Sequence, residues 1–314
     1  MKNGKKQPTH PTARRKSDNK VLLWLRIVRP QTLFASLCPV LVGLLLAGKT
    51  IGYAGINGHT TAVLTVVCAL ALQILSNLIN DYYDFRRGTD KAGRVGFSRA
   101  LAEGQVTEQQ MRVACFVALG VAVVTGAVLC YVGGWVILTI GVTAIIFAWL
   151  YTATDYSLSY LGIADIFVFL YYGVIATTGT VWLQLKAVGI DLQWANISQL
   201  LPAFYAGAVC GLISMCVLAI NNIRDIDGDR EAGKKTFPVR FGKTAALVCL
   251  GVIVALMPLF AWLAFGLSWA MLILIPAAYL YYKVLCAKGA EYNKCLLGAG
   301  LVNLCYVLLV WLSV

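Results

Sequence analysis

The chain has 314 residues, of which 60% are hydrophobic and only 13% are charged, and its mean hydropathy is +0.76. This composition excludes an ordinary soluble globular protein, which could not hide so much apolar surface from water. The net charge of +12 requires no nucleic-acid partner, because basic loops that set membrane topology and attract anionic lipid head groups account for it.

The first twenty residues are basic, polar and interrupted by Pro8 and Pro11. They lack the short apolar core and the cleavage site of a secretory signal peptide. We therefore expect residues 1–20 to be a disordered basic tail in the cytoplasm, and residues 21–314 to form a single membrane domain.

Nine apolar stretches are long enough to cross a bilayer as helices, which takes about 20 residues each. They cover 32–52, 60–82, 111–131, 134–152, 160–184, 199–222, 244–266, 267–286 and 294–313. The links near 131–134 and 266–268 are very short, so the helices that they join should be antiparallel neighbours. The sequence thus predicts an all-α, multi-pass integral membrane bundle of about nine transmembrane helices around a central cavity, open sideways to lipid.

Charged residues indicate how this bundle is oriented. If the N-terminus is cytoplasmic, every Lys and Arg except Lys49 and Lys186 falls in a cytoplasmic segment or at its helix ends. Such a bias is what the positive-inside rule describes. We expect a protein of the cell inner or plasma membrane with its N-terminus and its site facing the cytoplasm. The ten cysteines lie in or beside apolar spans without a CxxC pair, so they do not indicate a metal site.

Two acidic clusters close apolar stretches of this chain. The first runs Asn77-Leu-Ile-Asn80-Asp81-Tyr-Tyr-Asp84, and the second runs Asn221-Asn-Ile-Arg-Asp225-Ile-Asp-Gly-Asp229. Each places an Asn four residues before an Asp, and four predicted crossings separate the two clusters. An even number of crossings returns both to the same side of the membrane. Four helices per cluster also suggest an internal duplication, with two four-helix repeats followed by a ninth helix.

Helical spacing puts the oxygen-bearing side chains of each cluster on one face. Positions i, i+4 and i+7 share a face, and in the second cluster Asp229 joins if the helical turn persists. Mg²⁺ prefers carboxylate and amide oxygens, completed by water and substrate phosphates. Two such faces could hold Mg²⁺ ions around a diphosphate. The predicted metal ligands are Asn77, Asp81, Asp84, Asn221, Asp225 and Asp229.

Basic residues follow both clusters, and Arg94, Arg99 and Lys234 are the candidate diphosphate contacts. Taken singly, each acid could be a solvated helix end and each basic residue a topology anchor. The repeated spacing on one side favours a metal site. Asp165 lies near the cytoplasmic start of the fifth predicted helix. It could orient or deprotonate a hydroxyl group of a substrate. Alternatively, it could be there only because the helix dipole favours a negative charge at a helix N-terminus.

Three stretches carry a family resemblance: Arg29-Pro-Gln-Thr-Leu33, residues 73–99, and residues 219–242. They resemble the UbiA-type intramembrane aromatic prenyltransferases, and within them the members that act on 1,4-dihydroxy-2-naphthoate in menaquinone biosynthesis. The resemblance implies Mg²⁺-dependent transfer of a polyprenyl chain from polyprenyl diphosphate to that acceptor. Diphosphate and CO₂ would be lost, giving demethylmenaquinone.

In the terms of this resemblance, the candidate residues take two kinds of role. The catalytic candidates are Asp81, Asp225 and Asp165, and the substrate-binding candidates are Arg94, Arg99, Lys234 and Tyr151. The lipid bilayer would deliver the polyprenyl substrate.

Two alternatives remain open from the residues. The first is a prenyltransferase for another aromatic acceptor, such as 4-hydroxybenzoate. Relatives of that kind tend to carry Tyr-Pro and basic residues where this chain has Tyr151-Thr152 and Asp155. The second is a divalent-cation transporter, which would tend to place its acids near the middle of the bilayer in inverted repeats.

Overall fold

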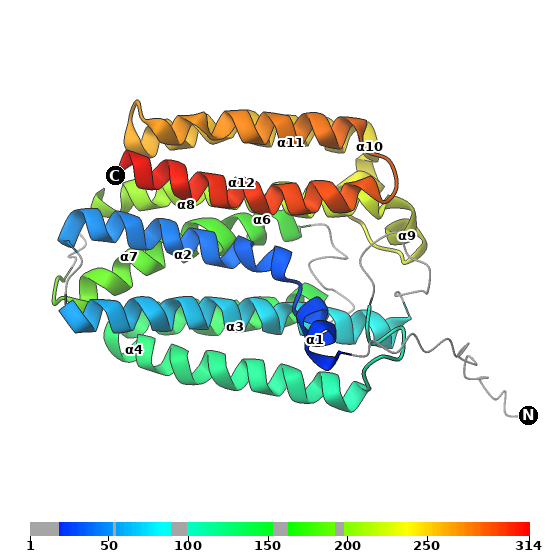
Figure 1. Ribbon diagram of the computed structural model, residues 1–314, viewed down its shortest axis with the longest axis horizontal. Helices are drawn as coiled ribbons and strands as arrows, with labels where there is room; N and C mark the ends of the chain where they lie inside the picture. The colour runs from blue at the N-terminus through cyan, green and yellow to red at the C-terminus, as the bar shows by residue number, and fades with distance from the viewer. Residues whose placement is uncertain (1–18, 53–54, 89–98, 153–162, 192–197) are drawn as a thin grey trace, which may run out of the picture.

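The computed structural model describes residues 19–52, 55–88, 99–152, 163–191 and 198–314, apart from the side chains at 55, 56, 151 and 152. Every regular element in these ranges is helical. The long helices lie side by side along one axis (Figure 1), and they are α2 (Pro30–Ile51), α3 (Gly55–Arg87), α4 (Glu108–Thr152), α8 (Leu201–Arg224), α10 (Phe237–Phe265) and α12 (Glu291–Ser313). In the described ranges, eight helical segments are long and apolar enough to cross a membrane. The predicted all-α membrane bundle is confirmed.

One of these eight segments contains two of the expected spans. Helix α4 is 45 residues long, about twice what a bilayer needs, but its backbone breaks at Gly134 with φ 70° and ψ −159°. Glycine reaches this conformation because it has no Cβ atom to clash. The indole Nε1 of Trp182 donates to the carbonyl of Gly133 at 2.9 Å, which ties the break to α7 (Ala176–Ala187). The spans predicted at 111–131 and 134–152 lie on either side of it.

The fifth expected span is not a regular α-helix. It consists of α6 (Ala164–Phe169), a π-helical turn η1 (Leu170–Ile175) and α7. Gly173 of η1 packs so closely on α8 that an added Cβ would lie 2.4 Å from the backbone nitrogen of Gly211 and 2.5 Å from the carbonyl oxygen of Gly207. Small residues four positions apart allow membrane helices to approach in this way.

Smaller elements complete the ends of the bundle. They are α1 (Lys20–Val28), α9 (Ile226–Glu231), the 3₁₀ turn η3 (Trp269–Ile273) and α11 (Leu274–Cys286). Helix α1 was not expected from the sequence. Asn19 Oδ1 caps it by accepting a hydrogen bond from Val21 N at 2.9 Å. The helix begins at Lys20, which was predicted to belong to the disordered tail. The rest of the predicted tail, residues 1–18, lies outside the described residues. Arg29, with φ 56°, then turns the chain into α2.

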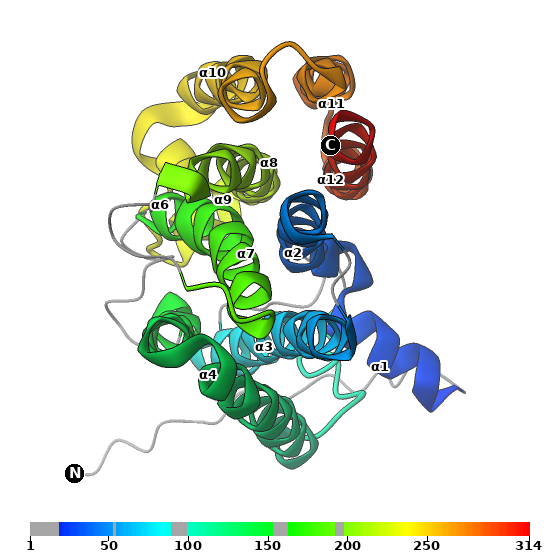
Figure 2. The ribbon, with the colours of Figure 1, turned by 90° about the vertical axis from the view of Figure 1, so that its left-hand side faces the viewer.

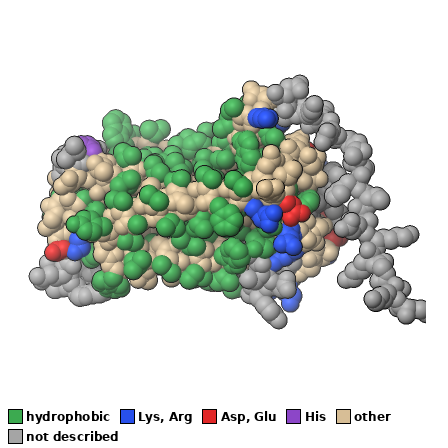
Figure 3. Space-filling model, turned by 90° about the horizontal axis from the view of Figure 1, so that it is seen from below, with side chains coloured by type: hydrophobic (Ala, Val, Ile, Leu, Met, Phe, Trp, Pro, Cys, Tyr) green, Lys and Arg blue, Asp and Glu red, His purple; other side chains and the backbone are tan. Residues whose placement is uncertain are grey.

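The main hydrophobic core joins α8, α10 and α12, where Ile213, Met257 and Tyr306 are fully buried. In the view along the bundle, α2, α3 and α7 lie between this core and α4 (Figure 2). The outer surface is apolar, with Phe116 and Trp311 largely exposed, and on the face in Figure 3 charged side chains gather toward the ends. An apolar girdle with charged ends is the surface that a bilayer requires.

Candidate active site

The two acidic clusters lie at the same end of the bundle. Helices α3 and α8 both reach that end with their C-terminal turns, beside α1 and α9 (Figure 1). Asn77 and Asn80 of the first cluster and Asn221 of the second line one cavity. Segments about 140 residues apart in the sequence thus line one cavity at one end of the bundle.

The first cluster presents Asn77, Asp81 and Asp84 on one buried face of α3. The guanidinium groups of Arg29 and Arg99 both contact the Asp81 carboxylate. Arg99 also reaches Asp84, with Nη2 3.6 Å from Oδ2. Buried carboxylates need such partners because an unpaired charge away from water is costly. Arg99, predicted to contact a diphosphate, therefore lies directly beside the predicted ligands.

Asn77 joins the first cluster to the start of the chain. Its Nδ2 atom donates to the carbonyl of Val28 at 3.0 Å and to Oγ1 of Thr32 at 2.9 Å. Its Oδ1 atom accepts from Nε2 of Gln73 at 3.3 Å. Asn77 therefore also fixes the junction of α1 and α2 against α3, a role that its spacing in the sequence did not indicate.

The second cluster keeps helical spacing across the end of α8. Asp225 N donates to the Asn221 carbonyl at 3.1 Å, and Asp229 N donates to the Asp225 carbonyl at 2.8 Å. The helical turn thus persists into α9, and the carboxylates of Asp225 and Asp229 are both buried. Lys234, the predicted diphosphate contact here, has its Nζ 3.5 Å from Oδ1 of Asp229.

Arg224 organises the second cluster from within. Its Nε and Nη2 atoms donate to the two oxygens of Asp225 at 2.8 and 2.7 Å. Nη2 also donates to Oδ1 of Asn221 at 2.7 Å. The Arg224 side chain is only 3% exposed, so it is part of the site and does not act as a topology anchor at the surface.

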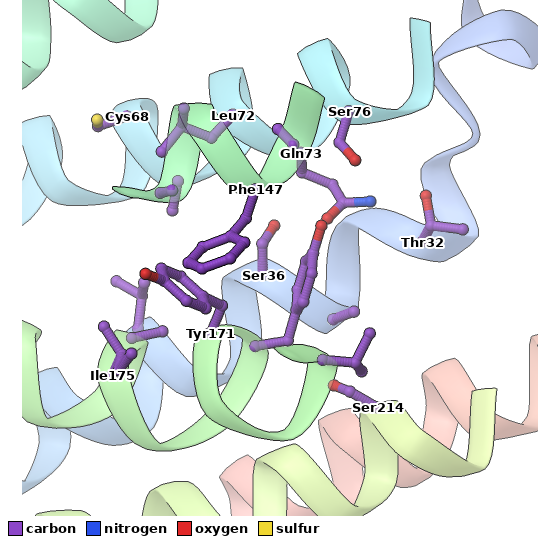
Figure 4. Close-up of a pocket in the computed structure, with 18 of the residues that line it drawn as sticks. Thr32, Ser36, Cys68, Leu72, Gln73, Ser76, Phe147, Tyr171, Ile175 and Ser214 are labelled. Atoms are coloured by element: carbon purple, nitrogen blue, oxygen red, sulfur yellow. The ribbon is translucent and has the colours of Figure 1, made fainter. Parts of the chain in front are cut away.

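The cavity has a volume of about 390 Å³, with walls from α2, α3, α4, α6, η1, α7 and α8 and one residue of α12. Leu72, Phe147 and Ile175 give it an apolar interior, as Figure 4 shows. Polar side chains, among them Gln73 and Ser214, line it as well. The cavity therefore offers an apolar space that adjoins the amides of both clusters.

The donor set suits Mg²⁺, since it consists of carboxylate and amide oxygens. Within the described residues, no three Asp, Glu, His or Cys side chains come close enough together to form a metal centre made by protein ligands alone. Mg²⁺ usually takes one or two carboxylates and completes its shell with water and substrate phosphates. The two clusters fit that kind of site better than a closed protein cage.

Three predicted site residues are not placed with these clusters. Arg94 and the side chain of Tyr151 lie outside the described part of the chain. Asp165 lies in the first turn of α6, which contributes Phe167 and Val168 to the described cavity lining but not Asp165 itself.

Arg29 and Asn80 belong to the site but were not among the predicted site residues. Arg29 contacts Asp81, and both Arg29 and Asn80 line the cavity. Both stand inside the stretches that carry the family resemblance, and that position was the available signal. The spacing of Arg29 and Asn80 in the sequence does not distinguish a residue of the site from an ordinary polar residue at the end of a helix.

The fold and site together define a multi-pass helical membrane protein with two carboxylate-rich clusters at one end, whose asparagines line a largely apolar cavity. Residues 36–299 match the UbiA prenyltransferase family, and the chain belongs to that family. Among its relatives, the 1,4-dihydroxy-2-naphthoate octaprenyltransferase of Escherichia coli is 34% identical over 314 residues, covering 92% of this chain and 95% of the relative. The enzyme of the same description from Mycobacterium leprae is 34% identical and covers 78% and 80%.

Solved structures share the fold. A UbiA homolog from Archaeoglobus fulgidus bound to Cd²⁺ superposes with a TM-score of 0.60 at 17% identity, covering 92% of this chain and 97% of the other. The same kind of protein bound to DMAPP and Mg²⁺ gives a TM-score of 0.56 at 17% identity, covering 91% and 97%.

Proposed function

We propose that this protein transfers a polyprenyl chain from polyprenyl diphosphate to 1,4-dihydroxy-2-naphthoate. The observation that carries the proposal is the meeting of Asn77, Asn80 and Asn221, from both clusters, on the wall of one largely apolar cavity. Relatives at 34% identity are named for this reaction. A polyprenyl diphosphate has the matching chemistry, because its head is a polyanion and its tail is a hydrocarbon.

The hydrocarbon tail would occupy the apolar part of the cavity, beside Leu72 and Ile175. Each buried CH₂ contributes about 0.8 kcal/mol, so a long chain partitions into the bilayer before it meets the enzyme. We infer that the tail enters sideways from the lipid, while the diphosphate stays at the end of the bundle that carries the acidic clusters.

The reaction begins when the bond between the allylic carbon and the diphosphate oxygen breaks. Negative charge then grows on the leaving diphosphate, and Arg99 and Lys234 are close enough to the clusters to stabilise it. Asp81, Asp84, Asp225 and Asp229, with Asn77 and Asn221, would hold Mg²⁺. When bound, Mg²⁺ supplies further charge neutralisation at the diphosphate oxygens. A UbiA homolog has been solved with DMAPP and Mg²⁺ bound, which supports the use of Mg²⁺ with a prenyl diphosphate in this fold.

The second half of the reaction forms a carbon–carbon bond between the prenyl chain and the aromatic ring. The ring loses its carboxylate as CO₂ and keeps both hydroxyl groups, so the product of the transfer is the hydroquinone form of demethylmenaquinone. Aromatic side chains such as Phe147 and Tyr171 line the cavity and keep water away from the allylic cation. Asp165, Arg94 and Tyr151 stay predictions for the acceptor and diphosphate contacts.

Incubation of membranes that contain the protein with a labelled allylic diphosphate and Mg²⁺ tests the proposal. Parallel reactions receive 1,4-dihydroxy-2-naphthoate or 4-hydroxybenzoate. We expect label only in the naphthoquinone product, and we expect EDTA to abolish it until excess Mg²⁺ is added back. Prenylation of 4-hydroxybenzoate alone would show that the acceptor is wrong. Product formation that is insensitive to EDTA would contradict the metal assignment.

A further inference from the structure

The cavity contains one buried amide with an unused oxygen. Gln73 lies on α3, one turn before Asn77, and only 6% of its surface is exposed. Its Nε2 atom donates to Oδ1 of Asn77, whose own Nδ2 is committed to Val28 and Thr32. This chain of bonds determines which end of the Gln73 amide is nitrogen, because the reverse orientation would set two acceptor oxygens face to face. Oε1 of Gln73 is then buried without a hydrogen-bond partner among the described residues.

A second unused polar atom lies on a different helix. The hydroxyl Oγ of Ser214, on α8, has no partner in the described ranges, and the residue is 3% exposed. Two other hydroxyl side chains of the cavity bond within their own helices. Thr65 Oγ1 donates to the Thr61 carbonyl at 2.7 Å, and Ser36 Oγ donates to the Leu33 carbonyl at 3.1 Å. Gln73 and Ser214 therefore differ from these neighbours.

A hydrocarbon chain gives these two atoms nothing to bind. Buried polar groups without partners are uncommon in proteins and indicate a missing ligand or water. The diphosphate is also unsuitable for Gln73, because a carbonyl oxygen can only accept a hydrogen bond and repels an anion. A neutral hydrogen-bond donor suits Gln73 within this apolar cavity, and the hydroxyl group of a phenol has that property.

We propose that Gln73 is a specificity-determining residue whose Oε1 accepts a hydrogen bond from a phenolic hydroxyl of the aromatic acceptor. The inference rests on the proposed function. In 1,4-dihydroxy-2-naphthoate the 1-hydroxyl bonds to the neighbouring carboxylate, so the 4-hydroxyl is the free donor for Gln73. Ser214 then donates to the carboxylate side of the ring. Figure 4 shows Gln73 and Ser214 on opposite sides of the pocket.

Aromatic side chains of the same cavity can receive the rings of this acceptor. Phe147 and Tyr171 lie with their ring centroids 5.1 Å apart and both line the cavity. Their faces offer the flat apolar surface that a naphthalene ring requires. The acceptor would thus be oriented by polar contacts at its two ends and by aromatic contacts along its body.

Equilibrium binding of two compounds tests the role of Gln73. The first is 1,4-dihydroxy-2-naphthoate and the second is 1-hydroxy-2-naphthoate, which lacks the 4-hydroxyl. Both are titrated into the reconstituted protein with Mg²⁺ and an unreactive thiodiphosphate analogue of the prenyl donor. We expect the wild type to prefer the dihydroxy compound roughly tenfold. Gln73→Met, which keeps the length of the side chain, should bring this preference close to one.

Two matched variants separate this effect from general damage to the cavity. Thr65→Val removes a cavity hydroxyl that is already bonded to Thr61, and it should keep the wild-type preference. Ser214→Ala should weaken the binding of both compounds to a similar extent, since both carry the carboxylate. It should therefore also keep the wild-type preference for the dihydroxy compound.

An unchanged preference in Gln73→Met would overturn the inference. If Gln73→Met cannot be purified folded, Ser214→Ala remains decisive, because full affinity for both compounds in that variant would refute this placement of the acceptor. Turnover by the wild type is measured in parallel. If the wild type prenylates dihydroxynaphthoate but Gln73→Met keeps the wild-type binding preference, only this inference is wrong. If the wild type does not prenylate dihydroxynaphthoate, the proposed function is wrong as well.

Discussion

Nη1 of Arg224 donates to Oδ1 of Asn293 at 2.8 Å, which links the end of α8 to the first turn of α12. The remaining nitrogens of the same guanidinium hold Asn221 and Asp225. Asn293 therefore supports the second cluster through Arg224, although it is far from that cluster in the sequence. A planar guanidinium can bond several oxygens at once in a fixed geometry, which a lysine cannot do.

Replacing this arginine should therefore weaken the site without removing its positive charge. We expect Arg224→Lys to lower kcat/KM for the prenyl diphosphate by roughly 10- to 100-fold, the usual effect of losing a residue that orients metal ligands. The Mg²⁺ concentration needed for half-maximal activity should rise. Arg230→Lys is the control, because Arg230 is exposed and, within the described part of the chain, forms an ion pair with Asp227 alone. Equal effects in the two variants would contradict the role of Arg224.

The carboxylates of the two clusters should be essential individually. We expect Asp81→Ala and Asp225→Ala each to reduce prenyl transfer by at least about 100-fold, because charge on the leaving diphosphate is then poorly stabilised. Asp227→Ala is the matched control. Its side chain lies between Asp225 and Asp229 in sequence but is 88% exposed. Size-exclusion profiles in detergent would establish that all three variants are folded, and full activity in Asp81→Ala or Asp225→Ala would refute the site.

Close packing of α6 and η1 on α8 should be sensitive to a single methyl group. A Cβ atom on Gly211 would lie 2.5 Å from the carbonyl oxygen of Phe169 and 2.8 Å from its ring. We expect Gly211→Ala to destabilise the protein by about 1–3 kcal/mol, seen as a lower unfolding temperature in detergent. Gly120→Ala is the control, since a Cβ atom added there would meet open space, with no heavy atom of the described neighbouring residues within 4 Å. If Gly211→Ala is as stable as Gly120→Ala, the helices can move apart enough to accommodate the added methyl group without cost, and the prediction is wrong.

Orientation in the membrane can be tested at the two ends of the bundle. The side chains of Asp191 and Asp227 are 77% and 88% exposed. In a Cys286→Ser background, which removes an exposed native thiol, a membrane-impermeant maleimide should label Asp191→Cys in intact cells. It should label Asp227→Cys only in inside-out vesicles. The reverse pattern would place the active site on the outer face.

Much of the fold could be predicted from hydropathy, because a long apolar helix must span the bilayer whatever its neighbours are. The break at Gly134 was predictable as the short link between two spans. The π-helical turn η1 was not, since it depends on how Gly173 meets α8 in three dimensions. Helix α1 was also missed, because its nine residues are too few to span a bilayer and two of them, Lys20 and Arg26, are charged.

The sequence by itself determined which oxygen-bearing side chains the two clusters contain, their Asn-x₃-Asp spacing and the even number of crossings predicted between them. These follow from covalent order and helical geometry, which are local properties. Only the tertiary structure decided that Arg29 and Arg99 both contact Asp81, that Arg224 reaches Asn293 on α12 while it holds Asn221 and Asp225, and that Gln73 keeps an unused oxygen in the cavity. Most of these partners come from different helices, and the packing of the helices, not the spacing along any one of them, brings these atoms together.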